Sequence, residues 1–396
     1  PAPAAHPLVS LWTQERVRHP KVEIVVAGTT VAGGFYERLV SVSVTDKEGV
    51  ASDTFQIDLN DGPPSFLAIP RKGAIVDIRV GYGSARSLGL FVVDKVKVNC
   101  LPYSMSISGK AADMRSGKMR ERQERHWDRK RVKDIVGDIA VDSGLSPSVD
   151  EEIGDHEYEW FGQQDESNMH VLRRLADRHN GLFKVRDGRL VFSKRGCGNS
   201  GSGAFLGSVV VTPRAIISGT CAFEANDRTK FKKVVAYHHD KGKAERIEIE
   251  ADADADGDSV YRIPEPFADV AEADKAAHAK AKELKRGEGA ASVTVVGDTA
   301  IVAGAPLMFE GVRPGLDGVP YIIDTATHTY RKSEGYRTQI SAKLYDGSSA
   351  KKKSDAAGGD SADASEDTVA KDAPSGTPAT PSEWSSTRRY GRTDEN

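Results

Sequence analysis

The stretch LVSVSVTDKEGVASDTFQIDLND, residues 39–61, alternates apolar and polar side chains twice, on either side of a polar break. In its first half Val40, Val42 and Val44 share one face of an extended chain, and serines take the other. In its second half phenylalanine, isoleucine and leucine alternate with glutamine, aspartate and asparagine. Successive side chains of a strand point to opposite faces, so the pattern predicts two strands that each bury one face.

The same alternation extends over residues 22–110, with further breaks at 61–64 and 81–83. These breaks contain Asp, Gly and Pro, which are typical of turns. Roughly six strands at this spacing predict a small barrel or sandwich. We assign residues 20–110 to this first barrel, behind an N-terminal arm of residues 1–19.

The periodicity becomes helical after residue 110. Apolar residues recur at helical spacing over 132–140, and a second helix is predicted at about 166–179, with Ser167 as a candidate N-cap. Two short apolar runs then flank an Asp-Gly turn, which predicts a hairpin. We therefore expect a smaller α/β insert over residues 111–203, ending in a glycine- and serine-rich stretch.

Strand patterning resumes near Val209 and continues to Leu344, interrupted by a helix predicted over residues 271–286. We assign residues 204–346 to a second barrel that includes this helix. The expected fold class is thus mainly β with an α+β insert: two barrels, a smaller α/β domain and a low-complexity C-terminal tail.

The two strand-rich regions resemble each other. Gly73 and Asp94 are 21 positions apart, Gly304 and Asp324 are 20 apart, and each pair is followed by a similar third block. An ordered match of three blocks favours an internal duplication. Two unrelated β-meanders would also look alike at this level, so that alternative stays open.

The tail, residues 347–396, is rich in Ala, Ser, Lys, Asp, Gly and Pro. Such a composition buries too little apolar surface to fold alone, which favours disorder unless a partner orders the segment. Its end carries Trp384, Arg388, Arg389 and Tyr390. Because aromatic residues and arginine dominate interface hot spots, we expect these four to bind a partner.

The composition of the 396-residue chain is that of a soluble globular protein, with 55 basic and 58 acidic residues and a formal net charge of -3. This balance does not favour general binding to nucleic acid or membrane. Cys100, Cys197 and Cys221 are widely spaced and form no CxxC pair, so a reducing compartment is expected. Residues 1–10 show no signal-peptide pattern, and no stretch is apolar enough to span a membrane.

Motifs that suggest chemistry are weak. Residues 252–257 copy the start of a calcium loop, but Ile263 stands where a bidentate Glu is required. His238 and His239 are adjacent on a predicted strand and point apart, so they cannot chelate one metal together. The basic run 110–133 offers phosphate contacts, but a solvated or subunit-facing surface is the preferred interpretation. We expect no catalytic residues, no metal and no cofactor.

An ordered series of blocks carries a family resemblance over about residues 20–345. The blocks are RLVSVSVTDKEGVASDTFQIDLND, LAIPRKGAIVDIRVGYG, GLFVVDKVKV, ISGKAADMRSG, ERHWD and DESNMHVLRRLADRHNGLFKVRDGRLVFSKRG. This series resembles the phage late control protein D family. The resemblance does not extend to the Asp252-rich loop or to the tail.

The resemblance implies a structural baseplate hub of a contractile tail, located in the virion and assembled in the host bacterial cytoplasm. Members of the family form a homotrimer in which each chain carries two tail-tube-like barrels. The implied partners are a central spike, the tail tube or a tube initiator, and surrounding baseplate proteins. DNA passes through the lumen without specific binding, and no stable membrane binding is implied.

Two other functions remain open. A spike of the type VI secretion kind would deliver effectors, although such chains usually continue into a repetitive β-helix. A hub with peptidoglycan hydrolase activity belongs to another class, and the insert leaves no region over for a lytic domain.

Overall fold

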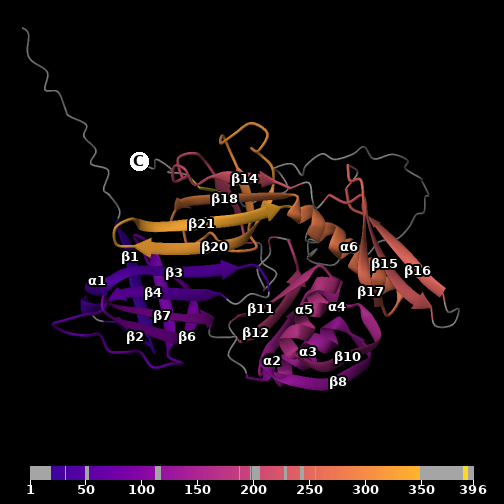
Figure 1. Ribbon diagram of the computed structural model, residues 1–396, viewed down its shortest axis with the longest axis horizontal. Coiled ribbons are helices and arrows are strands. Elements are labelled where there is room, and N and C mark those ends of the chain that lie inside the picture. Colours follow the sequence, from indigo (N-terminus) through magenta and orange to yellow (C-terminus); the bar gives the residue numbers. More distant parts are fainter. Residues whose placement is uncertain are drawn as a thin grey trace, which may run out of the picture.

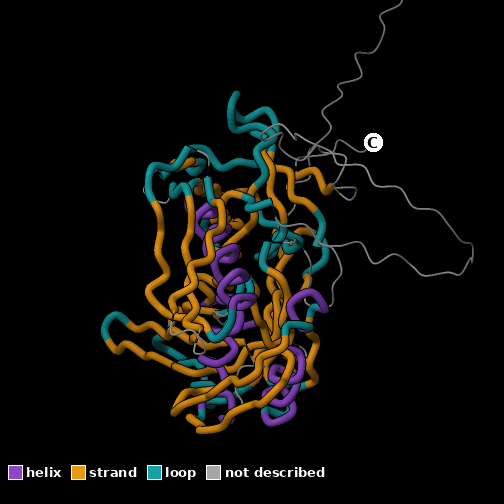
Figure 2. The backbone as a smooth tube through the Cα atoms, turned by 90° about the vertical axis from the view of Figure 1, so that its right-hand side faces the viewer, coloured by secondary structure: helices purple, strands orange, loops and turns teal. Residues whose placement is uncertain are grey.

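The computed structural model describes residues 19–31, 33–49, 53–111, 117–186, 188–196, 198, 206–226, 230–240, 245–254, 256–347 and 387–390. Over these residues the chain is mainly β, with a large sheet, three smaller sheets and helices of 4 to 18 residues (Figure 1). Figure 2, turned by 90°, shows the same predominance of strand over helix. Trp384 and residues 1–18 lie outside the described residues.

The first half contains the strands predicted from the alternating pattern. They lie in the order β3-β4-β7-β6-β5-β1-β2 within the large sheet, and their apolar sides form one core. The elements are β1 (Pro20–Val26), β2 (Thr29–Thr30), α1 (Gly33–Arg38), β3 (Leu39–Lys47), β4 (Thr54–Asn60), β5 (Ile75–Tyr82), β6 (Arg86–Cys100) and β7 (Tyr103–Ala111).

Val40 departs from the predicted alternation. A β-bulge interrupts the pairing of β3 with β4 between Leu39 and Ser41, and Val40 is 42% exposed. Val42 and Val44 are buried as predicted. The prediction was wrong for Val40, because a bulge adds one residue and shifts the side-chain alternation.

The insert has its own core between two small sheets and the helices α3 and α5. Both predicted helices and the predicted hairpin are present. The elements are α2 (Gly117–Arg120), β8 (Arg122–Arg131), α3 (Val132–Asp142), β9 (Ser146–Val149), α4 (Glu151–Gly154), β10 (Glu157–Ser167), α5 (Asn168–Arg178), β11 (Gly181–Arg186) and β12 (Arg189–Lys194).

The second half adds strands to the large sheet around a third core. Its elements are β13 (Ser208–Val211), β14 (Ala222–Ala225), β18 (Gly289–Val296), β19 (Pro306–Phe309), β20 (Tyr321–Arg331), β21 (Gly335–Leu344) and, from the tail, β22 (Thr387–Tyr390).

A fourth core separates part of the region that we assigned to the second barrel. β15 (Lys233–Asp240), β16 (Glu245–Asp252) and β17 (Val260–Phe267) form their own sheet, in the order β16-β15-β17. The predicted helix is α6 (Val270–Gly287), whose alanine face packs on this sheet. We call β15–β17 with α6 the side unit. Within the described residues its strands pair only with one another.

The two halves share one topology. In the first, the chain order β1, β3, β4, β5, β6, β7 gives the neighbour order β3-β4-β7-β6-β5-β1. In the second, the chain order β13, β14, β18, β19, β20, β21 gives β14-β18-β21-β20-β19-β13. They differ in that β1 pairs antiparallel with β5, whereas β13 pairs parallel with β19. The side unit is inserted between β14 and β18 of the second set.

Local geometry repeats as well. The pairing of β6 with β7 shifts register around Asp94, and that of β20 with β21 shifts around Asp324. Gly73 N donates to Val93 O at 2.8 Å, and Gly304 N donates to Ile323 O at 2.7 Å. Both glycines have positive φ, 85° and 84°, which glycine adopts without strain. The same bulge and turn occurring twice favour a duplication over two unrelated meanders.

The halves are joined edge to edge. β3 pairs antiparallel with β20, from Lys47↔Thr325 to Ser41↔Arg331. Figure 1 shows β20 and β21 lying along β3 and β4 at this join. One continuous sheet of fourteen strands therefore runs through both halves.

Candidate functional site

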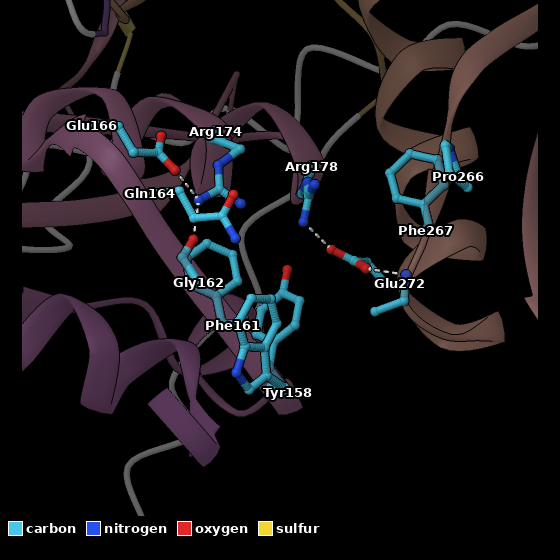
Figure 3. A pocket seen from close by; sticks show the side chains of 12 residues that line it. Tyr158, Phe161, Gly162, Gln164, Glu166, Arg174, Arg178, Pro266, Phe267 and Glu272 are labelled. Atoms are coloured by element: carbon cyan, nitrogen blue, oxygen red, sulfur yellow. Dashed lines mark hydrogen bonds and ion pairs between the residues drawn. The ribbon is translucent and has the colours of Figure 1, made fainter. Parts of the chain in front are cut away.

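A pocket of about 360 Å³ lies between the insert and the side unit (Figure 3). Strand β10 contributes Tyr158 and Phe161, the region where β17 leads into α6 contributes Phe267, and charged residues of α5 and α6 complete the wall. Trp160, on the same strand β10, is 53% exposed at its edge. The pocket therefore combines aromatic rings with ionic groups from two separately packed units.

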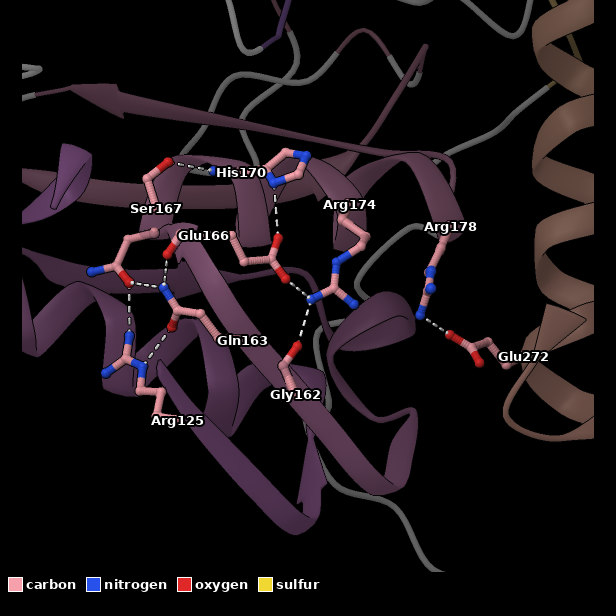
Figure 4. Close-up of polar contacts among 10 residues, drawn as sticks. Arg125, Gly162, Gln163, Glu166, Ser167, His170, Arg174, Arg178 and Glu272 are labelled. Atoms are coloured by element: carbon pink, nitrogen blue, oxygen red, sulfur yellow. Dashed lines mark hydrogen bonds and ion pairs between the residues drawn. The ribbon is translucent and has the colours of Figure 1, made fainter. Parts of the chain in front are cut away.

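Helix α5 aims its arginines at this pocket. Ser167 caps the helix by accepting from His170 N at 3.3 Å, as predicted from the sequence. Arg174 and Arg178 are four residues apart, so they lie on one face of the helix. Figure 4 shows both side chains directed from α5 toward carboxylates. Sequence analysis missed this pair, although the Arg-x-x-x-Arg spacing was visible.

Each arginine is held by a carboxylate and a ring. Arg174 Nη2 donates to Glu166 Oε1 at 2.5 Å and to Gly162 O at 2.6 Å. Its guanidinium lies 4.4 Å above the Phe161 ring. His170 Nδ1 lies 2.9 Å from the other oxygen of Glu166.

Arg178 ties the insert to the side unit. Its Nη1 donates to Glu272 Oε1 at 2.5 Å, and its guanidinium lies 5.7 Å from the Phe267 ring centroid. Glu272 is buried and also accepts from Ala268 N at 2.9 Å. We call Arg178 and Glu272 the clasp. A buried charge without a partner is strongly destabilising, so the buried carboxylate of the side unit depends on the arginine of the insert.

Histidines beside the pocket are held neutral. Tyr158 Oη and His179 Nε2 are 2.8 Å apart. Burial, followed by the nearby His156, lowers the pKa of His179 to about 3. Burial also lowers the pKa of His156. An imidazole so hard to protonate acts here as a packing and hydrogen-bonding group.

Arg125 connects four elements of the insert. Its Nε donates to Gln163 Oε1 at 2.7 Å, its Nη1 to Asp142 Oδ2 at 2.6 Å and its Nη2 to Asn168 Oδ1 at 2.8 Å. These contacts join β8 to β10, α3 and α5, and Figure 4 shows the contact with Gln163 of β10. At least this member of the basic run 110–133 is therefore structural.

A second candidate surface is the outward face of the large sheet, opposite the two cores. Register places Ser43 beside Thr329 and Thr45 beside Thr327 across the join. On the β4 side, the row of paired residues that contains Ser43 continues through Gln56 and Ser108. On the β21 side, the row that contains Thr327 continues through Gln339. We call this the polar face. It extends without a break from β6 to β18.

The charged residues of the polar face are mostly basic. Its acidic member is Asp58, which accepts from Ser41 and Ser106. Arg331 and Arg337 pair with Glu334 at its margin, and Lys343 pairs with Asp324. By register its basic members are Lys47, Lys95, Lys97, Lys110, Arg331, Arg337 and Lys343. This basic face stands out on a chain whose net charge is -3.

Three of the four predicted partner-binding residues lie on a described strand, and the fourth lies outside the described residues. Arg388, Arg389 and Tyr390 lie on β22, whose backbone pairs parallel with β13. Trp384 lies outside the described residues. The pairing places the end of the tail on the large sheet of its own chain, and partner binding by these four residues stays a prediction.

Two classes of site receive no support within the described part of the chain. No three His, Cys, Asp or Glu side chains gather there as a metal site. No helix among those residues is both long and apolar enough to cross a bilayer.

Comparison with known proteins identifies relatives. The family model for the phage tail baseplate hub (GPD) matches residues 73–334. The probable baseplate hub protein of Escherichia phage P2 is 25% identical over 359 residues, which cover 81% of this chain and 92% of the relative.

Solved structures share the fold. The 43 kDa tail protein of prophage MuSo2 from Shewanella oneidensis has a TM-score of 0.64 at 15% identity. The match covers 83% of this chain and 99% of the MuSo2 chain. An Escherichia coli component of the type VI secretion system, described as similar to the T4 tail proteins gp27 and gp5, has a TM-score of 0.51 at 12% identity. That match covers 81% of this chain and 76% of the Escherichia coli chain. The resemblance found in the sequence is confirmed.

Proposed function

This chain belongs to the phage tail baseplate hub (GPD) family, and on that premise we propose that three copies form a ring that joins a sixfold tail tube to a threefold spike. The hub acts mechanically: it templates the tube, holds the spike and leaves an open lumen when the spike departs. The family is a structural one, and we propose no catalytic step.

The repeated topology carries this proposal. Two halves with the same strand order, the same bulge and the same glycine turn offer two similar surfaces per chain. If each half closes as a tube-like barrel, three chains present six such surfaces. Cyclic symmetry with heterologous contacts then closes the ring.

The polar face suits the wall of the lumen. Its small hydroxyl side chains offer no pocket to a passing molecule, and its basic residues attract phosphate without reading sequence. We therefore assign the polar face to the inside of the ring, where DNA passes without specific binding.

The remaining partners follow from a place in the virion baseplate. They are a central spike protein, the tube or its initiator, and surrounding baseplate proteins, with assembly in the host bacterial cytoplasm. Trp384, Arg388, Arg389 and Tyr390 remain our candidates for contact with one of them.

Sedimentation of the purified chain at increasing concentration tests the proposal. We expect a trimer or a larger assembly, and a cryo-EM map of the particle tip should show three copies in a six-lobed ring. A strictly monomeric chain at high concentration contradicts the proposal.

The shared fold with a type VI secretion component supports a second candidate, a spike that delivers effectors. A pulldown from infected or induced cells separates the two. A separate spike subunit in the eluate supports the hub, and its absence favours the second candidate. A zymogram on cell wall tests for hydrolase activity, which we expect to be missing.

A further inference from the structure

Lys184 of the insert is held by two carboxylates of the first half. Its Nζ lies 2.7 Å from Asp46 Oδ1, in the last part of β3, and 2.9 Å from Asp53 Oδ2, just before β4. Both carboxylate side chains are 19% exposed, and that of the lysine is 26% exposed. Figure 1 shows β11, which carries Lys184, close to the end of β3. These three side chains meet where the insert rests on the first half, and we call them the joint.

The joint also reaches the second half of the chain. Asp46 Oδ2 accepts from Ala303 N at 2.9 Å, and Ala326 of β20 lies opposite Asp46 in the pairing of β3 with β20. Asp53 Oδ1 accepts from Lys47 N at 3.2 Å. One carboxylate thus contacts the insert and the second half at once. A change of charge at the joint therefore acts on contacts between all three parts of the chain.

The joint holds one more negative than positive charge when both carboxylates are ionised. Two carboxylates this close to one ammonium repel each other, and partial burial weakens the screening by water. Burial, followed by the charge of Asp46, raises the pKa of Asp53 to about 6. Burial acts in the same direction on Asp46, but the Lys184 ammonium holds the pKa of that carboxyl below its usual range. One proton taken up by the pair removes the excess charge and leaves the ammonium with one carboxylate.

We propose that the joint is a proton-controlled contact, in which one proton bound by the Asp46 and Asp53 pair closes the insert onto the two halves and release of the proton loosens it. The insert then rests more tightly on the rest of the chain in mild acid than at neutral pH. This device needs no second copy of the chain, so it is independent of the proposed ring.

The second half places two further titratable groups near the joint. Burial lowers the pKa of His328 on β20, against the charges of Asp46 and Asp298, so this imidazole is neutral near pH 7. Asp324, also on β20, pairs with Lys343 at 2.8 Å. Neither group supplies a second cation to the two carboxylates at neutral pH.

Glu48 is the group whose titration has to be separated from that of the joint. It follows Lys47, whose side chain is exposed, at the end of β3. Burial raises the pKa of Glu48, although the nearby Arg195 and Arg286 oppose the change. Glu48 therefore also binds a proton more readily than an ordinary glutamate, and a variant at this position is the matched control.

Hydrogen exchange of the full chain tests the joint. Asp53→Asn keeps the shape of the side chain and carries no charge, so it copies the protonated joint. Opening exposes Asp53 to water and returns its pKa toward 3.8, so the closed joint binds the proton more tightly. The protection factor of β11 in the wild type should match that of Asp53→Asn at pH 5 and be about tenfold lower at pH 7. Comparing the two chains at each pH cancels the titration of groups that both contain, including His179.

Two more variants sharpen the test. Asp46→Asn leaves Asp53 alone with the ammonium, so its protection relative to Asp53→Asn should change by less than about twofold between pH 5 and pH 7. Glu48→Gln should keep the full tenfold difference. Either neutral variant of the joint can serve as the reference, so the test stands if one of them does not fold.

The outcomes decide between proton control and a purely structural contact. A ratio of wild-type to Asp53→Asn protection that is the same at both pH values overturns the inference. So does a difference that disappears in Glu48→Gln and persists in Asp46→Asn. Sedimentation of the same samples shows whether the chain is trimeric, so a failure of the proposed hub is distinguished from a failure of the joint.

Discussion

Single residues decide how the insert and the side unit hold together. The clasp places a carboxylate that is 1% exposed against a guanidinium that is 21% exposed, with aromatic rings around them. The two partners are 94 residues apart in the sequence, so the clasp forms only when the insert and the side unit are both folded and in contact.

Removing one member of the clasp should therefore be costly. We expect Glu272→Ala to lower the free energy of unfolding by about 3 kcal/mol, because Arg178 would be left without its buried partner. Urea denaturation followed by tryptophan fluorescence measures this. Glu283→Ala is the control, since that side chain is 56% exposed and its loss should cost less than about 0.5 kcal/mol. Equal effects would show that the clasp is not buried in solution.

His179 should make the insert sensitive to acid. Its pKa is about 3 in the fold, below its usual 6.5, so the unfolded chain binds the proton first as the pH falls. Stability is thus present above pH 6.5 and lost on acidification, by about 2 kcal/mol between pH 7 and pH 5. Denaturation at both pH values should show a smaller loss in His179→Gln. An identical loss would mean that other groups cause it.

At the scale of elements, the glycine and aspartate spacing predicted the repeat, and the two halves share one strand order, but the core partners differ between the halves. Phe55 faces Gly109 in the first half, and Ala291 faces Ala342 in the second. At equivalent positions of the core, the first half pairs a large residue with glycine and the second half pairs two alanines. Repeated topology therefore does not require repeated packing.

The space around the Cβ position predicts opposite outcomes for alanine substitutions at two glycines, Gly109 in β7 and Gly137 in α3. A Cβ at Gly109 would overlap the Val92 carbonyl and lie 2.7 Å from the Phe55 ring. We expect Gly109→Ala to destabilise the chain by about 1–3 kcal/mol. Gly137 in α3 has open space around its Cβ, so Gly137→Ala should stabilise by about 0.5–1 kcal/mol. Thermal melts of both variants check this, and a tolerated Gly109→Ala would contradict the packing.

For the whole molecule, the polar face predicts weak, salt-dependent contact with DNA. Lys110→Glu with Lys343→Glu should reduce the slope of log affinity against log salt by about two units for a short duplex. Fluorescence anisotropy on the assembled hub measures it. Arg129→Glu with Lys130→Glu on β8 makes the same charge change elsewhere. A larger effect from the β8 pair would assign DNA contact to the insert.

The tail makes a separate prediction. Replacing Trp384, Arg388, Arg389 and Tyr390 by alanine should leave the trimer intact in sedimentation and abolish co-purification with one baseplate partner, because such residues dominate hot spots. Retention of every partner would contradict their role as anchors.

The sequence by itself determined many of the strands, the three longest helices, the repeated glycine and aspartate spacing, and the family. These features depend on side-chain periodicity and on backbone angles that neighbouring residues dictate, so they are local. The tertiary structure decided the rest: the bulges, including the one that turns Val40 outward, the separate core of the side unit, the clasp, and the β3–β20 join. These depend on pairing between residues far apart in the chain, where alternation shows that a strand has a buried face and leaves its neighbour unspecified.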